Sequence, residues 1–352
     1  AAAPAAASWP PQALTVSRWA PGGAALTADQ YLEWMRALLR RQRESEDAIL
    51  RFVQIDVLPH ALDHAGFQIR AFGSRAYGCA LPGSDVDVCG TMDPEAASSV
   101  KVAKRALLER MLELIRADRR CTAVKSAIVY KDTIEFKFAE LRVDFTFNPW
   151  KPMDQHTPSV LTDWLERSIS ELLEPDRAGR FIQLLLDCVR DTDACHSHTK
   201  GSIGNRLKSV HWALLGIAYW KTLRTVGVNR PVQGIIQGCL SYYGRLPFEK
   251  MLVDARGDEP FTSRPAHLDP HKHVYILDPT DGDQVRNLGD RVDADALRLL
   301  KTAVTAVNDQ LDRASSAFWS ERCSRWRAAE ERTYGEPAPR PLALCDVPHG
   351  PA

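Results

Sequence analysis

The chain has 352 residues, enough for two domains with sizeable cores, and 45% of its residues are hydrophobic. Its 45 basic residues balance its 45 acidic residues. That balance argues against a protein that coats nucleic acid, but it allows a local basic groove for an RNA end. No apolar run approaches membrane-spanning length, so no membrane partner is expected. The eight cysteines include no Cys-x-x-Cys pair, so no zinc ribbon or disulfide framework is predicted, and we expect a reducing, intracellular compartment.

Residues 1–26 begin AAAPAAASWPPQAL, a stretch of low complexity that predicts a flexible leader. Its lack of acidic residues is also compatible with an organellar transit peptide, so we expect a mitochondrial location or otherwise a cytoplasmic one. Residues 27–65 have helical periodicity, with Leu32, Met35 and Leu38 on one stripe and charged residues opposite.

The segment FGSRAYGCALPGSDVDV, residues 72–88, joins a Gly-Ser turn to two aspartates placed one residue apart. In a strand, side chains at positions i and i+2 leave the same face, so Asp85 and Asp87 are expected to direct their carboxylates to one point. A divalent cation removes their repulsion, and hard oxygen ligands favour Mg²⁺ or Mn²⁺. At the turn, Gly73 lets the backbone approach a phosphate, Ser74 can hydrogen-bond it, and a helix starting soon afterwards would add its dipole.

The following residues predict the rest of a mixed sheet flanked by helices. A helix is expected at about residues 98–117, and strands at residues 127–130 and 133–138. The run ELRVDFTFNPW then places Asp144 in an alternating strand. If this strand lies beside that of the acidic pair, three aspartates converge and can hold two metal ions for phosphoryl or nucleotidyl transfer. Asx turns and a solvated acidic strand end are the alternative.

Residues 149–199 contain two helical patterns, VLTDWLERSISELLEP and RFIQLLLDCV. We interpret them as a bridging insertion beside the cleft, which is either a platform for RNA or a protein partner or an embellishment without a function. The spacing of Cys188, Cys195, His196 and His198 fits no standard metal site, so a buried thiol and a polar loop are expected there.

The order of these motifs resembles the polymerase-β-type nucleotidyltransferase superfamily. The form GSxxxGxxLPGSDVDV is most similar to the noncanonical poly(A) polymerases and terminal uridylyltransferases, including the trypanosomatid RNA-editing type. The resemblance implies an α+β fold with a mixed-sheet catalytic domain at residues 27–148, whose first helix can also pack on the next domain. It also implies a mostly helical base-recognition domain at residues 200–334, and the proline-rich residues 335–352 are predicted to form a flexible tail.

The resemblance assigns further nucleotide-binding residues in the second domain. The segment KGSIGNRLKSV implies a ribose contact, the helix that follows implies two triphosphate contacts, and GCLSYYG implies a phosphate contact and a tyrosine stacked on the base. In that order the residues are Asn205, Lys221 and Arg224, Ser241 and Tyr243. Tyr242 is the alternative stacking residue if the helix is rotated by one position.

The segment VYILDPTDGDQVRNLGDRV resembles another family signature, at which the matching residues are Asp278, Pro279, Asn287 and Arg291. The loop between them lies near the base in this family. Asp281 and Asp283 are therefore candidates for base recognition, with ordinary turn acids as the alternative. The long apolar helix that usually precedes the signature is absent, so the C-terminal domain is expected to be small.

The resemblance implies a template-independent RNA 3′-terminal nucleotidyltransferase that uses two Mg²⁺ or Mn²⁺ ions and prefers UTP over ATP. Its partners would be the nucleoside triphosphate, an RNA 3′ end and, through residues 149–199, proteins of an RNA-processing complex. Poly(A)-polymerase-like use of ATP and an oligoadenylate or cyclic-dinucleotide synthase are the enzymatic alternatives. A noncatalytic RNA-processing scaffold is a third reading, although such a scaffold would be free to lose its aspartates.

Overall fold

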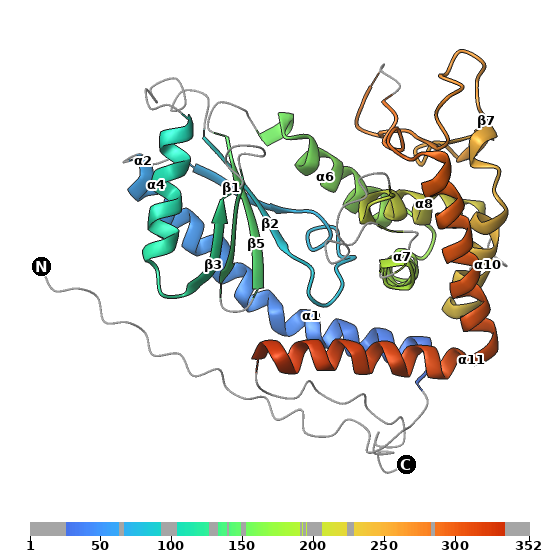
Figure 1. Cartoon of the computed structure of the whole chain (residues 1–352), viewed down its shortest axis with the longest axis horizontal. Coiled ribbons are helices and arrows are strands. Elements are labelled where there is room, and N and C mark those ends of the chain that lie inside the picture. The colour runs from blue at the N-terminus through green and yellow to red at the C-terminus, as the bar shows by residue number, and fades with distance from the viewer. Residues whose placement is uncertain are drawn as a thin grey trace, which may run out of the picture.

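A computed structural model describes most of the chain (Figure 1). The described residues are 26–62, 67–92, 104–126, 133–138, 141–148, 153–190, 192, 195, 206–223, 229–282 and 286–334. Several predicted features lie outside them, namely the leader up to residue 25, the strand at residues 127–130, the tail at residues 335–352, and His196, His198, Asn205, Arg224 and Asp283.

Five strands form the first sheet, in the order β1-β2-β5-β4-β3. In chain order they are β1 (Phe67–Phe72), β2 (Val86–Met92), β3 (Cys121–Ser126), β4 (Thr133–Phe138) and β5 (Leu141–Phe147). β2 and β5 are parallel, and the other neighbours are antiparallel. The predicted mixed sheet is thus confirmed, and the strand of the acidic pair lies directly beside the strand of Asp144.

One face of this sheet is covered by helices, because alternate strand residues are apolar. Val88, Val143 and Phe145 are fully buried on that face, against the π-helix η1 (Phe52–Val57), α2 (Leu58–Leu62) and α4 (Lys104–Ala117). The opposite face carries the polar residues of the same strands. This alternation leaves one face of the sheet available for a site.

Helix α1 (Ala28–Arg51) begins at a capping box between Thr27 and Gln30. The single helix predicted for residues 27–65 is therefore a succession of α1, η1 and α2. The first half of α1 packs into the core of the helical part of the molecule, where Leu32 and Trp34 are fully buried. Its end packs on the sheet through Ile49, so α1 joins the two cores.

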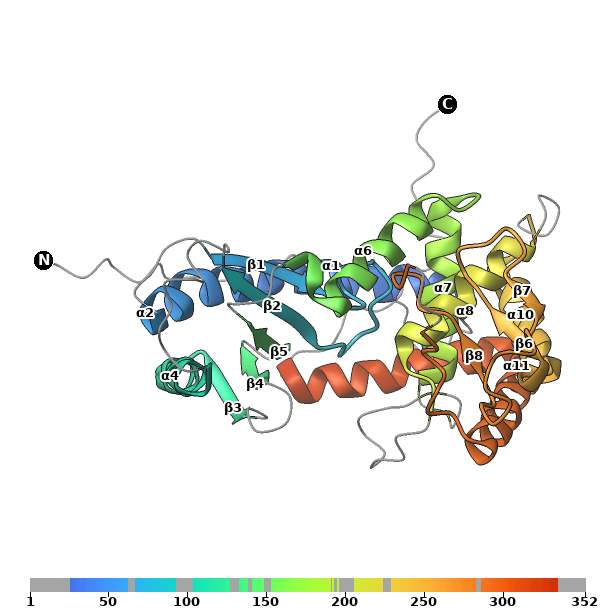
Figure 2. The same ribbon diagram turned by 90° about the horizontal axis from the view of Figure 1, so that it is seen from above.

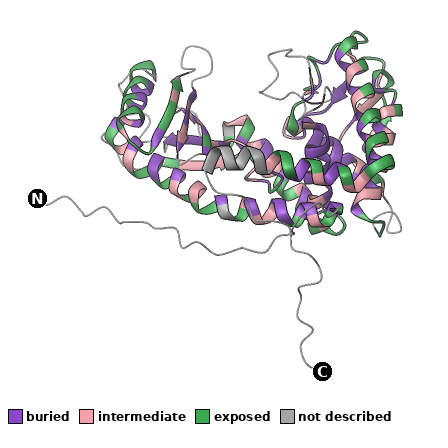
Figure 3. Ribbon diagram, turned by 60° about the horizontal axis from the view of Figure 1, so that its bottom comes forward, coloured by how far each residue is buried: buried purple, intermediate pink, exposed green. Residues whose placement is uncertain are grey.

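Over the described residues, the helical part contains the following α-helices besides the first half of α1 (Figure 1). They are α6 (Thr157–Ser170), α7 (Pro175–Arg190), α8 (Ser209–Thr222), α10 (Val232–Arg245) and α11 (Ala294–Tyr334), and the short 3-10 helices are η2 (Met153–Gln155) and η3 (Phe248–Lys250). Buried residues concentrate where these helices meet (Figure 3). Among the described helices, none is long and apolar enough to cross a membrane.

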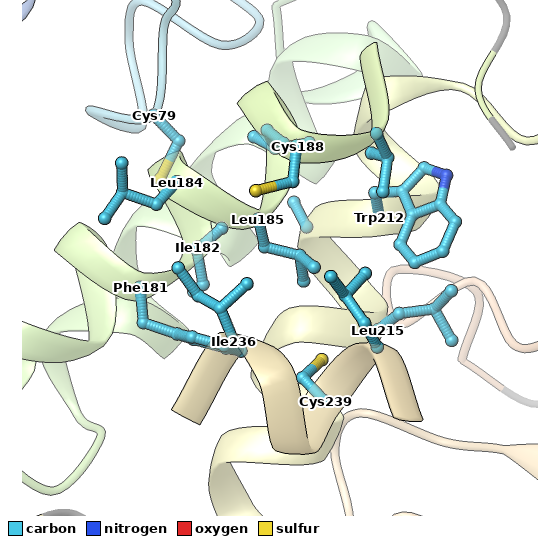
Figure 4. Packing of buried hydrophobic residues seen from close by; sticks show 14 of the residues in the cluster. Cys79, Phe181, Ile182, Leu184, Leu185, Cys188, Trp212, Leu215, Ile236 and Cys239 are labelled. Carbon is cyan, nitrogen blue, oxygen red and sulfur yellow. The ribbon is translucent and has the colours of Figure 1, made fainter. Parts of the chain in front are cut away.

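Helix α7 lies at the centre of this helical core. Every residue from Phe181 to Val189 is buried, and Leu185 and Cys188 lie among side chains of α8 and α10 (Figure 4). α7 is therefore a core helix, while α6 contacts both β1 and this core, and the interpretation of residues 149–199 as a bridging insertion or platform stays a prediction. The predicted buried thiol at Cys188 is confirmed.

Two features of the helical part are not predicted from the sequence. A second sheet, in the order β7-β6-β8, consists of β6 (Met251–Val253), β7 (Phe261–Ser263) and β8 (Tyr275–Ile276). Helix α11 has 41 residues and a kink at Ala314. Beyond the kink it runs beside α1 (Figures 1 and 2), with the Tyr31 and Trp319 rings stacked at 5.4 Å.

Candidate active site

A row of acidic side chains crosses the polar face of the first sheet. Asp87 on β2 and Asp144 on β5 are paired in register, and Asp144 is also paired with Glu135 on β4. Paired residues on neighbouring strands share a face, with Cβ atoms about 5 Å apart. Asp85 lies one residue before β2, and its carboxylate is near enough to Asp87 to act on the Asp87 pKa. The structure thus pairs two of the predicted aspartates, Asp87 and Asp144, and adds a further acidic residue, Glu135.

The charges of this row oppose one another, as the ionisation of Asp87 shows. Burial, and then the neighbouring carboxylates of Asp144 and Asp85, raises the pKa of Asp87 to about 7, while the Arg75 guanidinium acts in the opposite direction. Like charges opposite each other in a sheet are destabilising. A bound cation would remove that cost.

The Gly-Ser turn lies against the Asp87 carboxylate. Phe72, the last residue of β1, is paired with Asp87, and Gly73 follows with a φ of +75°. A Cβ atom on Gly73 would lie 2.2 Å from Asp87 Oδ2, so glycine is required here for both its backbone conformation and its size. The expected helix after Ser74 is not present, because residues 74–78 form turns.

Alanine substitutions at two glycines separate the requirement for a positive φ from the requirement for a small residue. We expect Gly73→Ala to lower the free energy of unfolding by roughly 1–3 kcal/mol more than Gly78→Ala, because only Gly73→Ala adds a collision. Gly78 is the matched control, with a φ of +76° and no atom within 4 Å of its added Cβ. Chemical denaturation of both variants measures the difference. Equal losses would mean that the Asp87 side chain moves away without cost.

Helix α6 holds the turn from the side of β1 (Figure 2). The Gly73 amide donates a hydrogen bond to Thr162 Oγ1 at 2.9 Å, and Thr162 is buried. One residue later, Asp163 forms an ion pair with Arg70 on β1. The α6 side chains therefore fix the position of the turn, a role that the sequence interpretation missed because α6 contacts β1 only in the tertiary structure.

Arg75 closes the loop between the turn and the acidic pair. Its side chain is 3% exposed and forms an ion pair with Glu46 of α1. It also donates to the Ser84 carbonyl oxygen, through Nε at 3.1 Å and Nη2 at 2.7 Å. Because Ser84 precedes Asp85, one guanidinium links the Gly-Ser turn to the first aspartate.

The same loop is also bound by the helical core (Figure 1). Gln183 of α7 donates to the Ala80 carbonyl oxygen at 2.7 Å, and Arg190 donates to the Pro82 carbonyl oxygen at 3.1 Å. The Arg190 guanidinium lies over the Trp326 ring of α11 at 5.1 Å. Helices α7 and α11 therefore support the loop that carries the acidic pair.

The donor set of the acidic row fits a hard divalent cation. Carboxylate oxygens are the ligands that Mg²⁺ and Mn²⁺ prefer, and Asp87 and Asp144 lie opposite each other on β2 and β5. Over the described residues, however, no three His, Cys, Asp or Glu side chains already have the arrangement of a metal site. Asp87 and Asp144 share a face of the sheet but not yet a coordination point.

The second domain corrects one nucleotide-binding prediction. The Tyr243 side chain is 0% exposed, and its hydroxyl donates to the Leu215 carbonyl oxygen at 2.6 Å. Tyr243 is thus a core residue, and the prediction that it stacks on a base is wrong. The neighbouring Tyr242 is only partly buried, and its ring lies 5.1 Å from the Phe261 ring. Ser241 on the same helix is also partly exposed.

Other predicted residues of this domain bind the protein itself. Lys221 Nζ donates to the carbonyl oxygens of Arg256 and Gly257 at 3.1 and 3.4 Å. Asn287 accepts from the Ile276 amide and donates to the Val274 carbonyl oxygen.

Asp278, in the loop after β8, is buried, and its Oδ1 accepts from both the amide and the hydroxyl of Thr280. Pro279 is buried, Asp281 is partly exposed and Arg291 is exposed. The signature therefore organises the loop after β8.

Comparison with known proteins identifies the class of the catalytic half. A family model described as a nucleotidyltransferase domain matches residues 60–149, which contain the first sheet, the turn and the acidic row. No curated protein sequence matches the chain significantly. Residues 60–149 are therefore similar to nucleotidyltransferase domains, the class that the motifs predict.

Solved structures of similar fold extend over most of the chain. A cytoplasmic RNA terminal U-transferase has a TM-score of 0.57 at 14% identity, covering 83% of this chain and 98% of that chain. The Cid1 poly(U) polymerase gives 0.57 at 14% identity, covering 81% and 94%. The noncanonical poly(A) polymerase mtPAP, in complex with ATPγS, gives 0.58 at 11% identity, covering 87% and 74%. The α+β fold is therefore confirmed beyond the catalytic half.

Proposed function

We propose that this protein is a template-independent RNA 3′-terminal nucleotidyltransferase that prefers UTP. The observation that carries the proposal is the pairing of Asp87 and Asp144 on adjacent strands, with Gly73 against the Asp87 carboxylate. Similar folds in a terminal U-transferase, a poly(U) polymerase and a poly(A) polymerase support RNA as the acceptor. Two of these structures are described as an RNA terminal U-transferase and a poly(U) polymerase, which supports UTP as the donor.

In the proposed reaction, the RNA 3′ oxygen attacks the α-phosphorus of the nucleotide, a new phosphodiester bond forms, and pyrophosphate leaves. Asp144 accepts the proton of the 3′ hydroxyl. Asp85, Asp87 and Asp144 would hold two Mg²⁺ or Mn²⁺ ions, which stabilise the attacking and leaving oxygens when bound. Ser74 and the backbone of its turn orient the triphosphate.

Incubation of the purified chain with labelled RNA, Mg²⁺ and one nucleotide at a time tests this function. We expect extension with UTP above that with ATP, GTP or CTP. Extension with ATP above UTP would retain the RNA nucleotidyltransferase and reject the base preference. Products formed from nucleotides without RNA would instead identify a synthase that joins nucleotides to each other.

Stacking of the base is proposed for Tyr242. We expect Tyr242→Ala to raise the KM for the nucleotide about tenfold, because base stacking on an aromatic ring contributes roughly 1–3 kcal/mol. Tyr243→Phe is the matched control, since it should leave KM unchanged and lower the stability by about 1 kcal/mol through loss of one buried hydrogen bond. Steady-state kinetics with thermal unfolding separates the two, and a KM effect confined to Tyr243→Phe would contradict the assignment.

A further inference from the structure

A pair of basic side chains lies next to the acidic row on the same face of the sheet. Lys137 on β4 is paired with Arg142 on β5, and each stands two residues from a member of the acidic row, Glu135 and Asp144. Positions two apart along a strand share a face.

This face of the sheet therefore carries two adjacent rows of opposite charge. The first is Asp87, Asp144 and Glu135, and the second is Arg142 and Lys137. Within each row like charges stand directly opposite, an arrangement that is destabilising in a sheet. The repulsion in the first row suits cations, and by the same reasoning the repulsion between Lys137 and Arg142 suits an anion.

The two basic side chains are available to a ligand. Arg142 is exposed and Lys137 partly exposed. Across the part of the chain that the structure describes, neither forms an ion pair or a hydrogen bond through its side chain. By contrast, Arg70 on the same sheet is paired with Asp163, and Arg75 with Glu46. Lys137 and Arg142 thus differ from the basic residues that hold the site together.

The position of the pair relative to Asp144 indicates which anion it binds. Arg142 lies two residues from Asp144, about 7 Å along the strand. That spacing is comparable to the distance between the 3′ hydroxyl of a nucleotide and its own 5′ phosphate. We propose that Lys137 and Arg142 bind the last phosphodiester of an RNA strand whose 3′ hydroxyl lies at Asp144, an inference that rests on the proposed function.

The proposal predicts that the pair acts on RNA and not on the nucleotide. For Lys137→Gln/Arg142→Gln we expect the dissociation constant for a labelled single-stranded RNA to rise about tenfold or more. The slope of log affinity against log salt should become shallower by about 0.7, because the pair neutralises one phosphate and each phosphate contact to a single strand contributes about 0.7. The KM for the nucleotide, and kcat at saturating RNA, should change less than about twofold.

The matched control is Arg105→Gln/Arg110→Gln, which removes the same charge from exposed residues of α4 on the opposite side of the sheet. Equal RNA binding by the two double variants overturns the proposal. A rise in the nucleotide KM without a change in RNA binding also overturns it, since the pair would then hold the triphosphate.

The experiment distinguishes failure of the basic-pair proposal from failure of the proposed function. If the wild-type chain binds RNA, the Lys137/Arg142 variant loses that binding and neither extends the RNA, the basic pair stands and the proposed function falls. If the wild-type chain extends RNA and the variant does so with an unchanged KM for RNA, the function stands and the basic pair falls. If the wild-type chain does not bind RNA, the proposal falls.

Discussion

Replacement of Asp144 by asparagine should lower the rate of RNA extension by about a thousandfold or more, because the variant loses both a proton acceptor and a metal ligand. The fold should persist. Asp144 stands opposite both Asp87 and Glu135, so removing its charge relieves repulsion and the unfolding temperature should stay constant or rise. Single-turnover extension and thermal unfolding of the same preparation measure both effects.

Asp312→Asn is the control for this variant, because Asp312 is exposed on α11 and far along the chain from the sheet. It removes the same charge by the same chemistry and should leave extension unchanged. Undiminished extension by Asp144→Asn would remove Asp144 from the reaction. Loss of activity together with a lower unfolding temperature would instead assign Asp144 a structural role.

The largest stability effect is expected at Asp187, which joins three helices of the core. Its buried carboxylate accepts from Tyr31 Oη of α1 at 3.1 Å, and from Arg322 Nη1 and Trp326 Nε1 of α11 at 3.1 and 3.2 Å. Asp187→Asn should lower the free energy of unfolding by about 3–5 kcal/mol, because the buried Arg322 charge loses its counter-ion. Tryptophan fluorescence during urea unfolding measures the change, since Trp34 and Trp319 are in this core.

An ion pair on the surface of α11 provides the comparison. Glu321 pairs with Arg325 across one turn of α11, and its side chain is 73% exposed. Glu321→Gln should change the free energy of unfolding by less than about 1 kcal/mol. A loss at Asp187 no larger than this would show that the Asp187 network does not hold α1, α7 and α11 together.

The catalytic half could be predicted because its signals are local. The Asp85 and Asp87 pair is adjacent in sequence, and the alternation around Asp144 identifies a strand without knowledge of its neighbours. Pairing between strands is different, because register depends on the whole sheet. For that reason the sequence predicts the strand of Glu135 correctly but does not indicate that Glu135 stands opposite Asp144.

The helical half was harder to predict, because burial there depends on how each helix is rotated. Tyr242 and Tyr243 are adjacent on α10, and one residue along a helix turns the side chain by about 100°. Only tertiary packing decides that Tyr243 faces the core. The sequence does indicate helix α11, because Leu300, Val304 and Leu311 recur at helical spacing and are buried.

If the acidic row holds a divalent cation, the stability of the metal-free protein should depend on pH in a direction that the Asp87 pKa determines. Asp87 has an ordinary pKa of 3.8, which the fold raises to about 7. A raised carboxyl pKa means that ionisation opposes folding, so without metal the stability should fall as the pH rises between these values. The loss is at most about 4 kcal/mol at 1.36 kcal/mol per pKa unit. Asp87→Asn should therefore be the more stable protein above the Asp87 pKa.

The most direct measurement is thermal unfolding of the wild-type chain and of Asp87→Asn at a pH above the Asp87 pKa. Each protein is measured with and without Mg²⁺, in buffer that contains no Ca²⁺. Binding to the folded state raises the unfolding temperature. We predict a rise of a few degrees for the wild-type chain with Mg²⁺ and little or none for Asp87→Asn. Equal shifts for the two proteins, or none for either at saturating Mg²⁺, would contradict a cation at this site and the nucleotidyl transfer that depends on it.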